Sequence, residues 1–278
     1  MRIESIVKPL SLKNSGELEV VFIGVGNMFA KEHGHTNFLL IKGDVHVMVD
    51  FGRTAPEKLT QVTGLDLPDI EVVLPTHSHS DHIGGLEQLA FANRYIGQKF
   101  MGKKKLQMIV TPEYERVLWD HSLRGGLAYS EDGPLGLRDF FDVIRPQWKS
   151  QSPREQFAVD IGDLHIELFR TNHIPDSSVN WQHAFISYGL FVDEHVFLSV
   201  DTKFDLDLLN TYETRSTVFF HDVQFFSGAV HAPLEDLKTL PGFVKERMYL
   251  KHYADNWNKQ DIAGFAGWAQ EGVRYIFE

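Results

Sequence analysis

Four side chains of the kinds that bind metal ions lie within six consecutive residues. In the stretch LPTHSHSDHIGG (74–85) these are His77, His79, Asp81 and His82. Alternate side chains of an extended loop point the same way, so His77 and His79 can hold one ion. Asp81 and His82 follow the bend and can reach a second ion. A polar loop that is rich in histidine by accident is the competing interpretation, but this set of four favours a metal site.

The composition limits what else can take part. The 278 residues contain no cysteine, so any metal must be held by histidine and carboxylate. The net charge of −11 opposes binding of a long polyanion such as nucleic acid. No apolar run is long enough for a membrane span, and the first residues lack the apolar segment of a signal peptide. We therefore expect a cytoplasmic protein without a membrane segment.

The elements around the histidine-rich loop must position it. The loop follows an apolar run at 71–76 and precedes a Gly-Gly pair that begins a helical pattern at 84–96. Elsewhere, short apolar runs end in turn residues, which is typical of β-strands. This rhythm predicts an α/β protein with two sheets covered by helices, in one domain spanning 1–278. The expected strands and hairpins are 18–24, 37–43, 45–52, 157–171, 184–202, 216–223, 247–253 and 273–277, and the other expected helices are 204–211, 233–240 and 258–271.

Residues 111–155 interrupt this rhythm. The segment is rich in aromatic residues and glycine and has weak helical periodicity. We interpret it as a helical or loop insertion, and long insertions of this kind often form lids. A small helical subdomain that only packs on the domain is the equal alternative. As a lid, the segment would place Trp119, Tyr129 or Phe140 over the metal site to stack on a substrate base.

The metal loop and four other segments together resemble the metallo-β-lactamase-fold hydrolases. The segments are VMVDFG with Asp50, RTNHIP with His173, FLSVDT with Asp201 and YLKHY with His252. The resemblance implies a four-layer αββα sandwich with a dinuclear metal site at the edge between its two sheets. It also implies two Zn2+ ions, with Mn2+ or Fe2+ as alternatives. The first ion would bind His77, His79 and His173, the second Asp81, His82 and His252, with Asp201 bridging both and Asp50 in support.

A pair of divalent ions defines the class of reaction. Two ions that share Asp201 would bridge a water and lower its pKa toward neutrality, so that a metal-bound hydroxide carries out hydrolysis. Asp81 would also orient that water. Phosphodiesters, thioesters, lactones and β-lactams all suit such a centre, so the fold alone does not choose the substrate.

His231 favours phosphodiesters among these substrates. It lies 21 positions before His252, in GAVHAPLEDL, where the ribonuclease Z-like branch of the family carries an additional histidine. The resemblance implies that His231 is the general acid for the leaving oxygen and that Asp222 is its acidic partner. The sequence departs from the branch in two places: Pro233 follows Ala232 where Ser or Thr is expected, and Asp222 replaces a glutamate.

The spacing between two ligands bears on the size of the substrate. Ribonuclease Z enzymes carry a tRNA-clamping arm between the third histidine and the bridging aspartate, whereas only 28 positions separate His173 from Asp201. With the acidic net charge, this spacing predicts a phosphodiesterase for small cyclic nucleotides in preference to a tRNA 3′-processing endonuclease. The chain resembles the cyclic-nucleotide phosphodiesterases of this branch, including phage and bacterial enzymes that degrade cyclic pyrimidine signals. The branch also implies a homodimer.

Two other interpretations stay open at this point. A thioester or lactone hydrolase, similar to glyoxalase II or the lactonases, would share the metal loop but lack the histidine acid. A scaffold that only binds a partner would have lost ligands, whereas every ligand position is filled in this chain.

Overall fold

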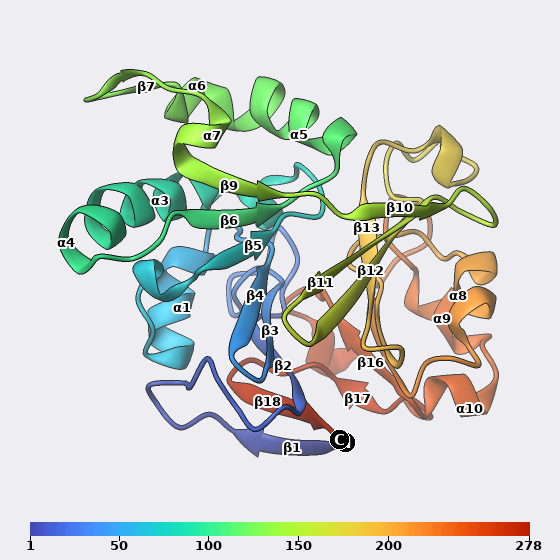
Figure 1. Ribbon diagram of the computed structural model, residues 1–278. Coiled ribbons are helices and arrows are strands. Elements are labelled where there is room, and N and C mark those ends of the chain that lie inside the picture. The colour runs from blue at the N-terminus through green and yellow to red at the C-terminus, as the bar shows by residue number, and fades with distance from the viewer. The chain divides into compact units, whose positions relative to one another are not determined.

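The computed structural model describes all residues from Met1 to Glu278, and they form two compact units (Figure 1). The first unit contains Met1–Gly24, Gly34–Pro146 and Glu271–Glu278, and the second contains Val25–His33 and Gln147–Gln270. Each unit is built on one eight-stranded sheet. The prediction of an α/β protein with two sheets is therefore confirmed, while the extent of the single domain stays a prediction.

The sheet of the first unit is mixed. The strands β2, β3 and β4 pair antiparallel, and β4, β5, β6 and β9 then pair in parallel. Gly43 turns the β3–β4 hairpin with a φ of 57°, a left-handed conformation that glycine adopts without strain. In spatial order the strands are β1 (Arg2–Ser5), β18 (Val273–Phe277), β2 (Leu18–Gly24), β3 (Asn37–Lys42), β4 (Val45–Val49), β5 (Val72–Leu74), β6 (Leu106–Ile109) and β9 (Phe141–Ile144).

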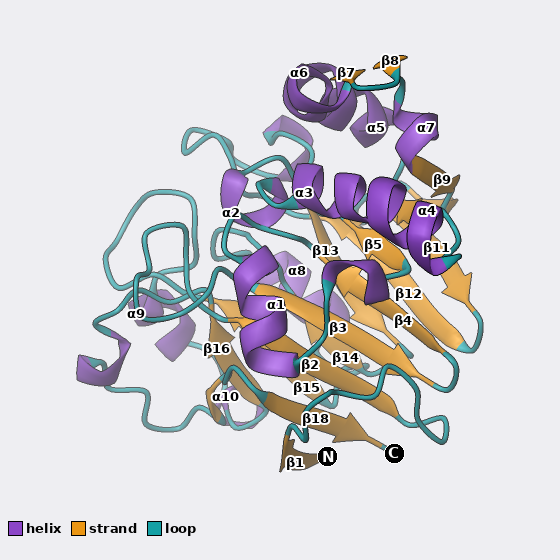
Figure 2. Ribbon diagram, turned by 90° about the vertical axis from the view of Figure 1, so that its left-hand side faces the viewer, coloured by secondary structure: helices purple, strands orange, loops and turns teal.

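Helices cover one face of this sheet, as Figure 2 shows for α1, α3 and α4. The first of them ends at Gly64, whose φ of 76° allows its N–H to bond the Thr60 carbonyl, and it buries Leu59 against the unit's core. The helices are α1 (Ala55–Thr63), α2 (Ser80–Ile83), α3 (Leu86–Phe91), α4 (Lys99–Met101), α5 (Pro112–Leu118), α6 (Arg124–Leu127) and α7 (Leu137–Phe140), with π-helical segments at Ala92–Gln98 and Trp119–Leu123 and a strand pair β7 (Tyr129–Ser130) and β8 (Gly133–Pro134).

The sheet of the second unit changes from antiparallel to parallel at β14. Because β14, β15 and β16 run parallel, their carboxyl ends lie at the same edge of the sheet. The ring of Tyr212, at the end of α8, packs on Phe169 and Phe191 with centroids 4.8 and 4.9 Å away. In spatial order the strands are β10 (Gln147–Ser150), β11 (Gln156–Ile161), β12 (Leu164–Arg170), β13 (Tyr188–Val192), β14 (Val196–Leu198), β15 (Val218–Asp222), β16 (Met248–Lys251) and β17 (Gly267–Trp268), and the helices are α8 (Leu206–Tyr212), α9 (Leu234–Lys238) and α10 (Gly242–Lys245).

Two sequence predictions about local structure need correction. The helix predicted for 258–271 is wrong, because Gly264 and Gly267 have φ values of 86° and 147°, and the segment contains only the end of a 3-10 turn at Trp257–Lys259 and the short strand β17. The segment 111–155 is more regular than predicted, since it contributes α5 to α7 and the strands β9 and β10. Within it Phe140 is fully buried, 5.7 Å from the ring of Phe91, so it packs in the core and does not line a substrate site.

Gly189 in β13 offers a test of how tightly the second unit is packed. A methyl group at this position would overlap the ring of Phe169 and the carbonyl oxygen of Ser199. We expect Gly189→Ala to lower the free energy of unfolding by about 1–3 kcal/mol, measured by urea denaturation, because an overpacked core must shift its side chains.

The matched control is Gly125→Ala in α6, where an added methyl group would meet no atom within 4 Å. This substitution should be neutral or stabilising by up to about 1 kcal/mol, since alanine is the better helix former. Equal effects of the two substitutions would contradict the packing described for β13.

Candidate metal and catalytic site

The histidine-rich loop of the first unit is organised by Asp50. This residue follows β4, and β4 and β5 pair in parallel with Val49 opposite Leu74, so Asp50 and the loop leave the sheet at the same edge. The Asp50 carboxylate accepts hydrogen bonds from the backbone N–H of Thr76 at 2.8 Å and from its hydroxyl at 2.9 Å. It also lies 2.6 Å from His82 Nδ1. These contacts hold the loop 76–82 against Asp50, and a supporting role of Asp50 beside a metal stays a prediction.

The contact with Asp50 fixes the orientation of the His82 ring. Since the carboxylate accepts, His82 Nδ1 carries the proton, and Nε2 keeps its lone pair and lies 3.5 Å from Asp81 Oδ2. Burial raises the pKa of the Asp50 carboxyl above its ordinary value, and the neighbouring His82 offsets part of that effect.

The other two histidines of the loop point toward one another. His77 Nε2 lies 3.1 Å from His79 Nδ1, and both Asp81 and His77 are buried. Two imidazole nitrogens this close suit a shared position for a cation. The backbone holds the loop in place, because Phe51 N–H bonds the His82 carbonyl at 2.6 Å and Gly52 packs directly on the carbonyl of Asp81 with no room for a Cβ.

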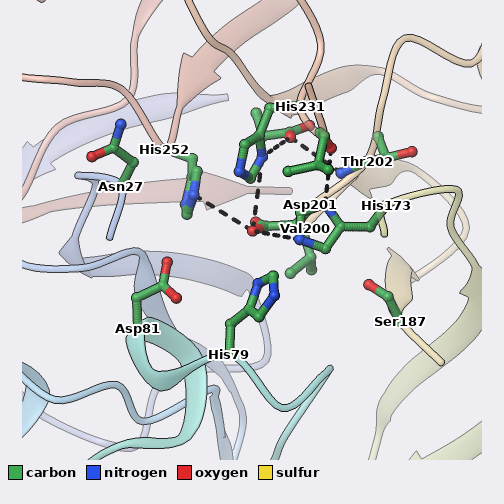
Figure 3. A network of polar contacts seen from close by, with 12 residues as sticks. Asn27, His79, Asp81, His173, Ser187, Val200, Asp201, Thr202, His231 and His252 are labelled. Atoms are coloured by element: carbon green, nitrogen blue, oxygen red, sulfur yellow. Dashed lines mark hydrogen bonds and ion pairs between the residues drawn. The ribbon is translucent and has the colours of Figure 1, made fainter. Parts of the chain in front are cut away.

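In the second unit three histidines surround one carboxylate oxygen (Figure 3). Asp201 Oδ2 lies 3.4 Å from His252 Nε2, 3.8 Å from His173 Nε2 and 3.9 Å from His231 Nδ1. Asp201 follows β14, His252 follows β16 and His173 follows β12, while His231 lies in the loop before α9. The ends of the strands therefore bring these residues together. His173 Nδ1 donates to the carbonyl of Val230 at 2.9 Å, which leaves its Nε2 as the electron-pair donor that faces Asp201.

The backbone at these strand ends is strained. Asp50, Val200 and His252 have φ values of 60°, 53° and 61°, which side-chain-bearing residues rarely adopt, and Val200 is also β-branched. The Lys251 ammonium donates to the carbonyl of Val200 at 2.6 Å and so holds that turn. Such strain is concentrated at functional sites, where the surrounding structure holds it in place.

His231 is held by Asp222. Its Nδ1 lies 3.0 Å from Asp222 Oδ2, and its side chain is 19% exposed whereas Asp222 is fully buried. Burial by itself raises the pKa of the Asp222 carboxyl, but hydrogen bonds from His221 and His231 outweigh it and hold the pKa below its ordinary value. Asp222 is therefore an anion that accepts from His231.

Every site residue predicted from the sequence lies in one of these two groups. The sequence reasoning missed Thr76, His221 and the strained Val200, although the first two adjoin recognised motifs. Neutral imidazole and carboxylate are the donors that Zn2+, Mn2+ and Fe2+ accept, so the residues fit a divalent metal site. The first group contains Asp50, His77, His79, Asp81 and His82, and the second contains His173, Asp201, Asp222, His231 and His252.

Solved structures define the class of protein to which this arrangement belongs. The metallo-β-lactamase-fold protein YhfI from Bacillus subtilis has a TM-score of 0.67 at 19% identity, covering 94% of this chain and 99% of its own. A diphosphatase of the PhnP family gives 0.65 at 15% identity, covering 94% and 98%. Human tRNase Z, short form, gives 0.61 at 15% identity, covering 94% and 99%. The fold is that of the metallo-β-lactamases, which confirms the predicted fold class.

The chain belongs to the family of the anti-Pycsar protein Apyc1, whose family model matches residues 18–275. It is 36% identical over 254 residues to Apyc1 of Paenibacillus sp. (strain J14), covering 90% of this chain and 93% of the relative. It is 32% identical over 242 residues to Apyc1 of Bacillus phage BSP38, covering 86% and 90%. Family and fold make the chain a hydrolase that acts on phosphodiester bonds, the enzyme class predicted from the sequence.

Asp50→Asn tests whether the carboxylate organises the metal loop. The amide would set an NH2 group against one of the donors that now reach Asp50 Oδ2, the Thr76 hydroxyl and His82 Nδ1. We expect the free energy of unfolding of metal-depleted protein to fall by about 1–3 kcal/mol, measured by urea denaturation.

The control is Asp44→Asn in the exposed β3–β4 turn, where the side chain is 86% exposed. A surface change of this kind should stay within about 0.5 kcal/mol. If Asp50→Asn changes the free energy of unfolding as little as the control does, Asp50 does not organise the loop.

Proposed function

We propose that this protein hydrolyses small cyclic nucleotides, with a cyclic pyrimidine mononucleotide as the preferred substrate. The observation that carries the proposal is the pair His231–Asp222 beside Asp201 and two ligand-type histidines. A phosphodiester hydrolase needs both an electrophilic centre and an acid for the leaving oxygen, and these residues supply the positions for both. The anti-Pycsar family of the chain supports the same class of substrate.

We infer that the two groups of ligands together hold two divalent ions, most simply zinc. His77, His79 and His173 would hold one ion, Asp81, His82 and His252 the other, and Asp201 would join both. When bound, the ions supply Lewis acidity and lower the pKa of a bound water. The tautomers of His82 and His173 support this assignment, because each directs an Nε2 lone pair away from the group that accepts its Nδ1 proton.

His231 would act as the general acid. With Nδ1 against Asp222, its Nε2 is the nitrogen that can carry a proton to the substrate. As the attacking oxygen bonds to phosphorus, the ester P–O bond breaks and the leaving sugar oxygen takes the proton from Nε2. The product is a linear nucleoside monophosphate. The partial exposure of His231, at 19%, gives a substrate access to its ring.

A compact substrate agrees with the segment between His173 and Asp201. The only helical element of the loop 174–187 is a 3-10 turn at Trp181–His183. Lys203 holds the loop, because its ammonium donates to the carbonyls of Asp176 and Ser178, each at 2.7 Å. No arm that could clamp a tRNA is inserted there. With the net charge of −11, this favours a small substrate over a long nucleic acid.

The cellular location and the oligomeric state of the protein are a separate part of the proposal. None of the helices has the length and apolar character to cross a bilayer. A cytoplasmic location, expected from the composition, and a homodimer, implied by the resemblance, remain predictions of ours. Light scattering coupled to size-exclusion chromatography measures the second directly.

The metal content of ligand variants and the effect of a chelator on activity test the proposed ligands. We expect elemental analysis to find two metal ions per chain in gently purified protein, falling to one or fewer in His79→Ala and His252→Ala. A chelator should abolish hydrolysis, and added Zn2+ or Mn2+ should restore it. His183→Ala, at an exposed histidine in the 174–187 loop, serves as the control and should keep both ions. Unchanged metal content in His79→Ala and His252→Ala would rule out these ligands.

His231→Ala should separate phosphodiester hydrolysis from the thioester and lactone alternatives. We expect kcat on a substrate with an alkoxide leaving group, such as a cyclic mononucleotide, to fall by about 10²–10⁴-fold. On bis(p-nitrophenyl) phosphate the loss should be far smaller, because p-nitrophenolate leaves without protonation. A variant that cleaves cyclic nucleotides at the wild-type rate would exclude His231 as the acid.

A further inference from the structure

A second histidine, His221, is buried directly behind the catalytic pair. It lies in β15 next to Asp222, is fully buried, and stacks its ring on that of Phe197 at a centroid distance of 6.4 Å and an interplanar angle of 24°. Its Nδ1 is 2.8 Å from the backbone carbonyl oxygen of Asp222 and 3.2 Å from Asp222 Oδ1. No feature of the proposed reaction described so far uses this side chain.

The surroundings of His221 specify its tautomer. Both groups near Nδ1 are acceptors, so Nδ1 carries a proton. Nε2 is buried and has no hydrogen-bond partner. A buried N–H without an acceptor costs about 1–3 kcal/mol, so the tautomer with its proton on Nδ1 is favoured over the one with its proton on Nε2. His221 is therefore a donor whose Nδ1 faces Asp222.

Donors fix the Asp222 carboxylate at both of its oxygens. Oδ1 receives the Ser199 hydroxyl at 3.0 Å and faces His221 Nδ1, while Oδ2 receives the Thr202 N–H at 3.1 Å and faces His231 Nδ1 at 3.0 Å. The group cannot rotate without breaking several of these bonds at once. The direction of Oδ2, and with it the orientation of the His231 ring, therefore depends on what holds Oδ1.

We propose that His221 is a positioning residue that acts through Asp222 to orient His231. This inference rests on the proposed role of His231 as general acid. A leucine would fill the same space in β15, between Phe219 and the strand end, without leaving a buried ring nitrogen unused. A buried polar residue that breaks the local apolar pattern in this way points to a functional role.

The test compares His221→Leu, which removes the donor, with His221→Asn, whose side-chain amide nitrogen can occupy nearly the place of Nδ1. For His221→Leu we expect kcat on a cyclic mononucleotide to fall by roughly 10–100-fold, the scale expected when a catalytic group is misplaced. KM, metal content and the rate on bis(p-nitrophenyl) phosphate should change by less than about twofold. His221→Asn should recover most of the loss. The matched control is Phe197→Leu, which disturbs the packing of the His221 ring but removes no donor.

Combining the substitutions distinguishes the possible failures. In a His231→Ala background, His221→Leu should have no further effect on cyclic nucleotides, because its effect passes through His231. Equal losses on both substrates, or a loss that persists in that background, would overturn the positioning role while leaving the general acid intact. If His231→Ala itself shows no selective loss, the proposed function fails first and the inference falls with it.

A second measurement keeps the inference testable if His221→Leu does not fold. Long-range ¹H–¹⁵N correlation spectra of the wild-type protein report which ring nitrogen of each histidine carries the proton. We expect His221 to be protonated at Nδ1 and unprotonated at Nε2. A proton on Nε2 with a bare Nδ1 would contradict the donor role.

Discussion

The site depends on carboxylates that are buried at the ends of strands and held there by hydrogen bonds. A buried, ionised carboxylate is costly unless donors replace its water. Asp50 meets this requirement through Thr76 and His82, and Asp222 through Ser199, Thr202 and two histidines. Because Thr76, Ser199 and Thr202 follow strands that run parallel to those of the carboxylates, the bonds that solvate the carboxylates also fix these turns.

These bonds decide what each imidazole can do. An acceptor near Nδ1 keeps the proton on that nitrogen, so Nε2 retains a lone pair that can bind a metal ion. His82 and His173 both have such an acceptor at Nδ1. His231 has the same kind of contact, with Asp222, but is partly exposed. Its Nε2 can therefore exchange a proton with a substrate. Burial and neighbouring groups therefore suit each of these histidines to its proposed role, ligand for His82 and His173 and acid for His231.

Much of this organisation could be predicted from the sequence, because the relevant signals are local. The ligands sit at the ends of apolar runs, and short strands with turn residues mark both sheets. The predictions failed where structure depends on contacts distant in the chain. The helix predicted for 258–271 does not form, because glycines in this segment have positive φ values. Phe140, which was predicted to stack on a substrate, is buried in the core. His221 escaped notice because a single buried histidine in a strand has no spacing signal, and its meaning appears only from its distance to Asp222.

The strained residues could not have been found from composition either. Val200 has a left-handed backbone that its residue type disfavours, and only the surrounding bonds, such as that from Lys251, make it possible. Strain of this kind is a property of the folded arrangement, and it marks the strand ends where the chemistry lies.

The most direct measurement of the central claim is ³¹P NMR of a cyclic pyrimidine mononucleotide incubated with metal-loaded protein. The account predicts that the resonance of the cyclic diester disappears and that of a linear nucleoside monophosphate replaces it. A cyclic diester that persists, while the same preparation consumes a thioester or a lactone, would contradict the account.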